Sequence, residues 1–383
     1  MPEIVLNTSM SYLYDVKGTM INFRRGGVVD VPEGVYHDLI RTGYFGDPRR
    51  RCDPVAPRQL SAVPGGSEVP IFRDVGLGDV LMAAVPLRDL QAKHPRLRLV
   101  YGVHSHFVPL FRGSSFVKGG VRPIPSFVGT FPYVVDLRGY CERQEIGRRI
   151  DRTDVFSRHL LGGPPSSYET VLNPPATWLA QGRKIAGLSG SRPVVGYVPR
   201  ASQSMRNWRA PQHRRFVDTA VAQGWTVVLL DRGTPKTDLG DGDRVRDLRG
   251  RISILDLAKV VKACDVVVTP DTGTLHLAEA LGTRWVGYFT SVSPRLRVGY
   301  YRWGRALYPE GRLACLGCHY SPSCKERNPT PCAALTTPEQ AWREVELVYS
   351  SDPPWNPFAW ETAGEPDGRR GSGATEAAEV LML

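Results

Sequence analysis

The chain has 383 residues, 42% of them hydrophobic and 23% charged, and this length suits two domains of ordinary size. It has no apolar run of about 18 residues that could span a membrane and no secretion signal, so we expect a cytoplasmic protein, from a bacterium or encoded by a phage. The net charge of +11 favours anionic partners such as nucleotides, phosphorylated glycans, nucleic acid or an anionic membrane surface, and the odd count of seven cysteines argues against a disulfide framework.

Residues 1–46 predict a small β-rich module. The stretch VKGTMINFRRGGVVDVP alternates between apolar and polar residues, and we expect a turn at Gly26 and Gly27. A short helix is expected from Glu33 to Thr42. The module resembles small modules of phage-encoded proteins.

Residues 47–67 are rich in Pro, Arg, Gly and Ser without periodicity, and they predict a linker. The first large domain, residues 68–190, has the order strand, turn, helix, strand of a parallel βαβ unit. Its expected elements are strands at 69–75, 96–103 and 133–139, a helix at 80–94 and helical segments around 142–161.

The second large domain, residues 191–346, predicts four strands that alternate with three helices. The strands are expected at 193–199, 225–231, 264–270 and 284–290, and the helices at 211–223, 254–263 and 274–281. We therefore predict an α/β protein with two Rossmann-like parallel lobes that face one cleft, where ligands bind at the carboxyl ends of the strands. Residues 347–383 form a C-terminal extension whose end has the composition of a disordered tail.

The most informative segment is CDVVVTPDTGTLHLAEALGT, residues 264–283, in which a predicted buried strand leads directly into a helix. Gly273 lets the backbone approach a ligand, and the free N–H groups of the helix start form an anion site suited to a diphosphate. The candidate donor-binding residues here are Asp271, Thr272, Gly273, Thr274 and His276. Alternatively, Asp271 and Thr272 only cap the helix.

This segment resembles the signature of glycosyltransferase family 9, the heptosyltransferase-like enzymes, in which D-T-G-x-x-H-x-A-x-x-L-G follows a strand. The residues that fit it are Asp271, Thr272, Gly273, His276, Ala278, Leu281 and Gly282. In that family the loop holds the nucleotide and diphosphate of a nucleotide-sugar donor. The resemblance covers roughly residues 69–345 and implies a GT-B fold, with the acceptor on the first lobe and the donor on the second.

A second segment that resembles the family is GLGDVLMAAVPLRDLQAKHP, residues 76–95. The family carries G-x-G-D at the end of the first strand, and Gly76, Gly78 and Asp79 fit this pattern as an acceptor-side loop. The resemblance implies that Asp79 is the general base, which takes the proton of the acceptor hydroxyl during attack on the anomeric carbon. Alternatively, Asp79 is only the N-cap of the helix.

The segment VGYVPRASQSMRNWRAPQHRRFV, residues 195–217, resembles the family's strand, small-residue loop and K-x-W-P. Arg206 stands where the family has its phosphate-binding Lys, which implies that Arg206 neutralises the leaving diphosphate. Ser202 and Ser204 are candidates to donate hydrogen bonds to a phosphate of the donor. Alternatively, this segment is only a solvated basic loop. The family's Gly-rich turn with an acidic residue for the ribose is poorly matched, and the segment LLDRGTPKTD offers only Gly233 and Asp238, neither of which we assign to this role.

Four cysteines lie before a helix expected at 337–345. The spacing Cys315-x2-Cys318-x5-Cys324-x7-Cys332 begins like a zinc knuckle, and several family members carry similar clusters. A structural zinc and free or locally paired thiols are both compatible with it. Because no D-x-D clamp stands where a metal-dependent transferase would have one, we expect no catalytic metal and no required cofactor.

We therefore predict an inverting, metal-independent glycosyltransferase that moves a sugar from a nucleotide-diphosphate sugar to an acceptor hydroxyl. The expected acceptor is a saccharide such as the lipopolysaccharide core, which the resemblance implies. The alternatives are a hydroxylated base of phage DNA and a non-catalytic nucleotide-sugar-binding or adaptor protein. A dinucleotide-dependent oxidoreductase is disfavoured because Leu81 stands where the third glycine of G-x-G-x-x-G would be.

Overall fold

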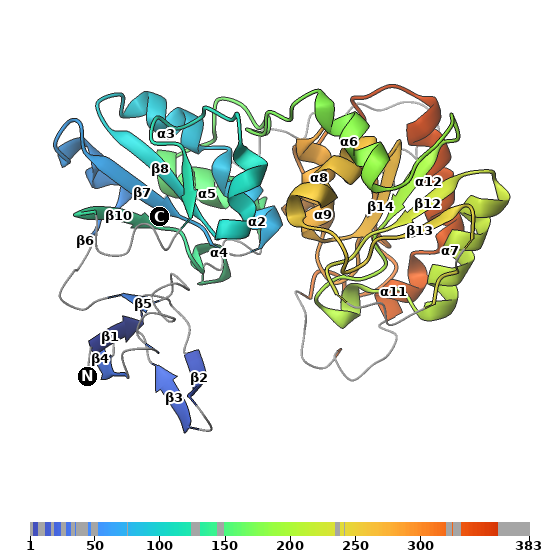
Figure 1. Ribbon diagram of the computed structural model, residues 1–383, viewed down its shortest axis with the longest axis horizontal. Coiled ribbons are helices and arrows are strands. Elements are labelled where there is room, and N and C mark those ends of the chain that lie inside the picture. Colours follow the sequence, from blue (N-terminus) through green and yellow to red (C-terminus); the bar gives the residue numbers. More distant parts are fainter. Residues whose placement is uncertain are drawn as a thin grey trace.

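The computed structural model describes residues 53–358 except 75, 124–130, 144–148, 234–237, 241, 319–323 and 325–330, and before them residues 3–6, 12–16, 19–23, 28–31, 35 and 45–46. The described residues form two α/β lobes side by side, with the N-terminal strands below the first lobe in the view of Figure 1.

Short antiparallel strands occupy the region for which the sequence predicts a β-rich module. Strand β1 (Glu3–Leu6) pairs antiparallel with β4 (Val28–Asp30) and β5 (Phe45–Gly46), and β2 (Tyr12–Val16) pairs antiparallel with β3 (Thr19–Phe23). The expected turn at Gly26 and Gly27 lies outside the described residues, as does the expected helix at 33–42 except for Val35.

The first lobe contains a parallel sheet of five strands in the order β6-β10-β7-β8-β9. Its elements are β6 (Asp53–Pro54), η1 (Pro57–Ala62), β7 (Glu68–Phe72), α2 (Leu77–Ala84), α3 (Leu87–Lys93), β8 (Arg98–Val103), η2 (Ser105–Phe111), β9 (Val121–Pro123), β10 (Tyr133–Asp136), α4 (Tyr140–Arg143) and α5 (Arg152–Leu161). The helix expected over 80–94 is two helices, because Pro86 lacks the N–H that a continuous helix would use there.

The expected linker at 47–67 is wrong for residues 53–67. Strand β6 pairs parallel with β10 at the edge of the first sheet, and Leu60 of η1 is buried in the core of this lobe. The sequence did not show this because β6 has two residues and η1 has six, which is too short for a visible periodicity. Residues 47–52 lie outside the described part.

The second lobe contains a parallel sheet of six strands in the order β13-β12-β11-β14-β15-β16. The strands are β11 (Val194–Tyr197), β12 (Thr226–Leu229), β13 (Val245–Asp247), β14 (Val266–Pro270), β15 (Arg284–Tyr288) and β16 (Gly304–Leu307). The helices are α6 (Thr177–Ile185), η5 (Ser204–Arg206), α7 (Ala210–Ala222), α8 (Ile254–Ala263), α9 (Gly273–Ala280), η6 (Pro294–Leu296), α11 (Pro331–Leu335) and α12 (Pro338–Ser350).

Numbered along the chain, this sheet has the doubly wound order 3-2-1-4-5-6. The strand order reverses between β11 and β14, and a crevice at the carboxyl ends of these two strands is where such folds bind ligands. The sheet has two more strands than the four expected, namely β13 and β16. The sequence did not predict them because they are only three and four residues long and each contains an arginine.

A buried histidine in the second lobe predicts a pH dependence of stability. His213 is 4% exposed, its Nδ1 lies 2.5 Å from the Tyr197 hydroxyl, and burial lowers its pKa from 6.5 to about 4. Between these two values the unfolded chain binds a proton that the folded chain does not, so folding stability falls as the pH decreases. We expect this residue alone to lower the free energy of unfolding by about 3 kcal/mol between about pH 7 and pH 4. Urea unfolding of the wild type and of His213→Gln should show a smaller loss in the variant; equal losses would contradict the assignment.

Candidate functional site

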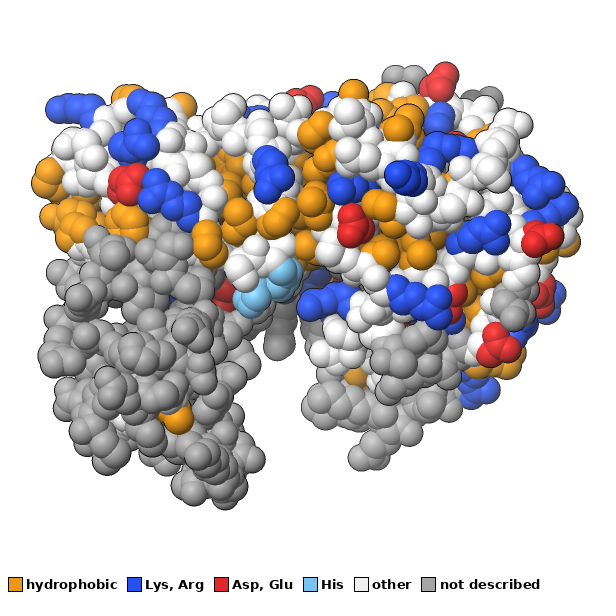
Figure 2. Space-filling view, in the orientation of Figure 1, with side chains coloured by type: hydrophobic (Ala, Val, Ile, Leu, Met, Phe, Trp, Pro, Cys, Tyr) orange, Lys and Arg blue, Asp and Glu red, His pale blue; other side chains and the backbone are white. Residues whose placement is uncertain are grey.

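A cavity of about 860 Å³ opens between the two lobes. It lies beyond the carboxyl ends of β7 in the first lobe and of β11, β12 and β14 in the second, and its volume is typical of small-ligand sites. Figure 2 shows histidine side chains beside the hollow between the lobes. The crevice predicted by the strand order is therefore present, and the first lobe closes its other side.

Helix α9 begins immediately after β14, and its first turn lines the cavity with Thr272, Gly273 and Thr274. Thr272 is the N-cap residue, but its side chain makes no capping bond and instead lies 2.9 Å from the Thr269 hydroxyl. Thr272 therefore stands at the N-cap position without capping the helix through its side chain. A Cβ atom on Gly273 would lie 2.7 Å from the Leu77 Cβ of the first lobe, so glycine allows the two lobes to meet here.

Asp271 holds two arginines at the edge of the cavity. Among the residues that the structure describes, its buried Oδ2 has no hydrogen-bond partner. This oxygen lies 3.5 Å from Arg206 Nη1 and 3.9 Å from Arg297 Nε, while Arg206 Nη1 donates to the Asp271 carbonyl at 2.6 Å. Burial raises the pKa of this carboxyl, but Arg206, His276 and Arg297 outweigh burial and hold it well below its usual value. Asp271 is thus an ionised carboxylate that lies between two arginines.

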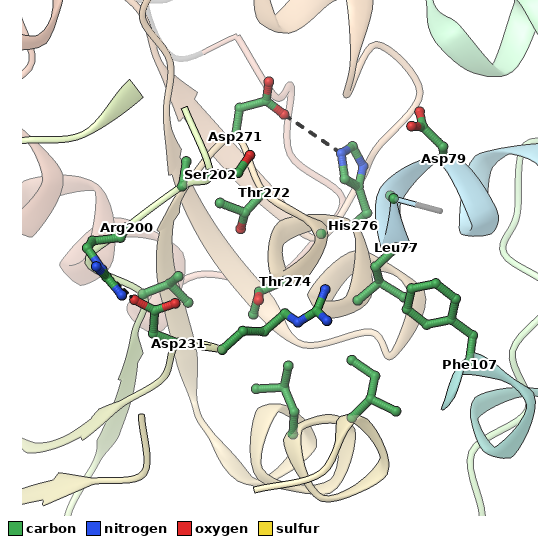
Figure 3. A pocket seen from close by; sticks show the side chains of 18 of the residues that line it. Leu77, Asp79, Phe107, Arg200, Ser202, Asp231, Asp271, Thr272, Thr274 and His276 are labelled. Atoms are coloured by element: carbon green, nitrogen blue, oxygen red, sulfur yellow. Dashed lines mark hydrogen bonds and ion pairs between the residues drawn. The ribbon is translucent and has the colours of Figure 1, made fainter. Parts of the chain in front are cut away.

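His276 lies between the loop 271–274 and helix α2 of the first lobe. Its Nδ1 lies 2.6 Å from the Tyr301 hydroxyl and its Nε2 lies 3.9 Å from Asp271 Oδ1, the contact marked in Figure 3. A Cβ atom on Gly78 would lie 2.3 Å from the His276 ring, so α2 and α9 can pack this closely only because Gly78 has no side chain.

Gly78→Ala is a direct test of this contact. We expect the added methyl group to lower the free energy of unfolding by about 1–3 kcal/mol through overpacking, measured by thermal unfolding. The matched control is Gly163→Ala, where a methyl group would meet no atom within 4 Å. Equal stability of the two variants would show that the lobes do not meet at Gly78.

Asp79 lies in the first turn of α2 and faces the cavity (Figure 3). Its Oδ2 accepts a hydrogen bond from Arg73 Nη2 at 2.7 Å and its Oδ1 accepts one from Arg152 Nη1 at 2.5 Å. Burial raises its pKa, but the charges of Arg152 and Arg73 outweigh burial, so the pKa of Asp79 lies below its usual value. Asp79 is thus an ionised carboxylate at neutral pH.

The alternative that Asp79 is the N-cap of α2 is wrong, because the N-cap is Gly76. Gly76 has φ 77°, and a Cβ atom on it would lie 2.7 Å from Asp79 Oδ2. Glycine is therefore required twice here, for the left-handed backbone and for the room that the carboxylate occupies.

The structure brings all but one of the residues predicted for this site to the cavity. Gly76, Gly78, Asp79, Ser202, Arg206, Asp271, Thr272, Gly273, Thr274 and His276 all line it. Ser204 is exposed and does not line the cavity, and the side chain of Asp238 is 87% exposed. Asp231, which accepts a bond from Arg200 Nε at 2.7 Å, stands at the cavity instead (Figure 3).

Several cavity residues were not predicted from the sequence. They are His106, Phe107 and Arg152 from the first lobe and Arg200, Asp231, Arg232, Ser253, Ile254, Leu257 and Arg297 from the second. Arg200 and Asp231 follow the carboxyl ends of β11 and β12. Because ligands of such sheets bind at the carboxyl ends of the strands, both residues could have been predicted from the sequence. Arg152 and Arg297 follow no such strand end.

The predicted cysteine site finds no support in the described part of the chain. Among the described residues, no three His, Cys, Asp or Glu side chains are grouped so as to hold a metal ion. Cys315 is exposed, Cys318 is half-buried and Cys332 is buried. In the residues that the structure describes, no helix has both the length and the apolar character to cross a membrane.

Comparison with known proteins gives a family match over the second lobe. Residues 168–307 match the family model described as Glycosyltransferase family 9 (heptosyltransferase). Lipooligosaccharide heptosyltransferase 2 of Haemophilus influenzae is 25% identical over 160 residues, which are 38% of this chain and 43% of that protein. The match thus spans less than half of the curated relative, and Asp79 lies outside the residues of the family match.

Solved structures resemble a larger part of the chain. E. coli ADP-heptose lipopolysaccharide heptosyltransferase II has a TM-score of 0.58 and 15% identity, covering 74% of this chain and 98% of that one. A family 9 glycosyl transferase of Veillonella parvula has a TM-score of 0.58 and 13% identity, with coverages of 75% and 98%. The iron-containing glycosyltransferase TibC of enterotoxigenic E. coli has a TM-score of 0.55 and 16% identity, with coverages of 74% and 76%. The predicted α/β fold of GT-B type is confirmed.

Proposed function

Residues 168–307 match the family model of glycosyltransferase family 9, and from this match we propose that the protein transfers a sugar from a nucleotide-diphosphate sugar to an acceptor hydroxyl. One observation supports this most strongly. The ionised carboxylate of Asp79 and the anion-binding start of α9 line the same cavity from opposite lobes. Such a transfer uses both groups at once, because it needs a base that deprotonates the acceptor and an anion-binding site that stabilises the leaving diphosphate.

On the donor side, Arg206, Arg297 and the first N–H groups of α9 stabilise the diphosphate as it leaves. Four arginines, Arg73, Arg152, Arg206 and Arg297, surround the two carboxylates of Asp79 and Asp271, which leaves a net positive charge for an anionic ligand. Because these cations are held in place by buried carboxylates, they need little rearrangement during the reaction. Transfer should therefore persist in the presence of a chelator.

On the acceptor side, Asp79 is the general base of a single inverting displacement. The acceptor oxygen bonds to the anomeric carbon while its proton passes to Asp79 and the bond from that carbon to the diphosphate oxygen breaks. Arg73 and Arg152 keep the carboxylate ionised and fix its direction before the acceptor arrives. His276 supports the donor loop from behind through Tyr301.

The substrate proposal follows the relatives. The curated relative is named a lipooligosaccharide heptosyltransferase, and one structural neighbour, with a TM-score of 0.56, is described in complex with ADP-D-beta-D-heptose. We propose a saccharide acceptor such as the lipopolysaccharide core and an ADP-linked sugar as the first donor to test.

The experiment supplies nucleotide-diphosphate sugars and core saccharides to the full chain and measures released nucleoside diphosphate, with and without EDTA. Release that depends on both substrates and persists in EDTA supports the proposal. Absence of release with every donor contradicts it.

A further inference from the structure

The first turn of α5 connects the proposed base to the second lobe. It contains Asp151, the N-cap residue, followed by Arg152 and, two residues later, Asp154. Arg152 donates to Asp79 Oδ1 at 2.5 Å, whereas Asp151 and Asp154 both accept hydrogen bonds from the second lobe. One helical turn therefore holds Asp79 with one side chain and the opposite lobe with two others.

Asp154 is the centre of this contact. Its Oδ2 accepts a hydrogen bond from the Tyr300 hydroxyl of the second lobe at 2.6 Å, and its Oδ1 accepts one from Tyr168 at 2.5 Å. The two tyrosine rings stack with their centroids 3.4 Å apart. Burial raises the pKa of Tyr300 to about 12, so its hydroxyl remains a donor at neutral pH. Next to this pair, the Gly299 N–H donates to Asp151 Oδ2 at 3.3 Å.

The segment of the second lobe that makes these bonds also contacts the proposed donor site. Arg297, two residues before Gly299, has its Nε 3.9 Å from Asp271 Oδ2. Tyr301, directly after Tyr300, bonds to His276 at 2.6 Å. The segment 297–301 thus contacts the donor loop on one side and the turn that carries Arg152 on the other.

We propose that Tyr300 and Asp154 are positioning residues of the transfer reaction, because their hydrogen bond holds the lobes together and fixes the turn from which Arg152 orients Asp79. The inference rests on the proposed function for its catalytic consequence. When Tyr300 leaves Asp154, the turn loses a bond from the second lobe, and Arg152 loses its fixed position beside the carboxylate. Asp79 is then correctly held only while the lobes are closed on the donor.

The charged and titratable groups that face Asp79 come from several elements. Arg73 follows β7, Arg152 belongs to α5 and Arg297 belongs to the second lobe, and the phenols of Tyr101 and Tyr301 are also within electrostatic range. Of the two arginines that hydrogen-bond to Asp79, only Arg152 lies in the turn that bonds to Tyr300. Loosening that turn should weaken the interaction of Arg152 with Asp79, which is one of those that keep the carboxyl ionised.

The test compares Tyr300→Phe with Tyr168→Phe. Both changes remove one hydroxyl donor to Asp154 and keep the aromatic ring, but Tyr168 is attached on the first-lobe side, where Ser166 Oγ donates to Asp89 at 2.7 Å. We expect Tyr300→Phe to lower kcat/KM about tenfold, as for loss of a hydrogen bond to a charged group, and to move the acidic limb of its pH profile upward. Tyr168→Phe should keep kcat/KM within about twofold and leave the limb in place.

A second measurement is independent of catalysis. Dyes placed on exposed positions of the two lobes report their separation by energy transfer, and Tyr300→Phe should increase the open fraction in the presence of ADP while Tyr168→Phe should not. Equal behaviour of the two variants in both measurements, or lost activity in Tyr300→Phe with an unmoved acidic limb, overturns the proposal. If the wild type transfers no sugar at all, the proposed function fails, and the lobe separation still decides whether Tyr300 and Asp154 close the lobes.

Discussion

Asp79→Asn is expected to lower kcat by about 10²- to 10⁴-fold, which is the usual contribution of a general base. The amide cannot take the proton of the acceptor hydroxyl, although it has nearly the same shape as the carboxylate. Binding of a nucleoside diphosphate should be nearly unchanged, because Arg206, Arg297 and the start of α9 all belong to the second lobe. Released diphosphate measures the first effect and calorimetry measures the second.

The control for this variant is Asp238→Asn, the same chemical change at a side chain that is 87% exposed. Asp79→Asn also removes the carboxylate between Arg73 and Arg152, so its thermal unfolding must be measured beside its activity. Loss of diphosphate binding together with activity in a folded variant would contradict the role of base. Full activity would contradict it as well.

Arg206→Met is expected to lower kcat about 10²-fold, which is typical when one group that stabilises developing charge is removed. Arg206 lines the cavity, and its Nη1 is fixed by the Asp271 carbonyl at 2.6 Å, so its charge is in place before the donor binds. Arg206→Lys should recover most of the activity, since the family 9 enzymes that this segment resembles have a lysine at this position. Kinetics with saturating donor separate this loss of kcat from weaker binding; a Lys variant as inactive as the Met variant would argue against a charge effect.

The positions of Asp79, Gly76, Gly78 and the loop 271–274 were predictable because each follows a short apolar strand directly. A strand end that turns at a glycine into a helix leaves a recognisable pattern over a few residues. The fold class followed from the same alternation of strands and helices. Strands β13 and β16 were missed because they are short and polar, and β6 was hidden in a segment rich in Pro and Arg.

The residues that hold the site together were not predictable in the same way. Arg152 is 73 residues from Asp79 along the chain, and Tyr300 is 146 residues from Asp154. Nothing local distinguishes Arg152 or Arg297 from the many other arginines of this basic chain. Arg152 is selected by the packing of α5 against α2 within the first lobe, and Arg297 by its contact with Asp271 within the second. The packing of the two lobes against each other explains why Gly78 must be a glycine opposite His276.

The central claim is that the cavity between the lobes binds a nucleoside diphosphate, and thermal unfolding of the full chain with ADP, UDP, GDP, CDP and dTDP tests it most directly. At roughly 100 times its dissociation constant, the correct diphosphate should stabilise the folded protein by about 2.7 kcal/mol. We predict a selective rise of the unfolding temperature with one of the five, reduced in Arg206→Met. No rise with any of them would contradict a donor site in this cavity.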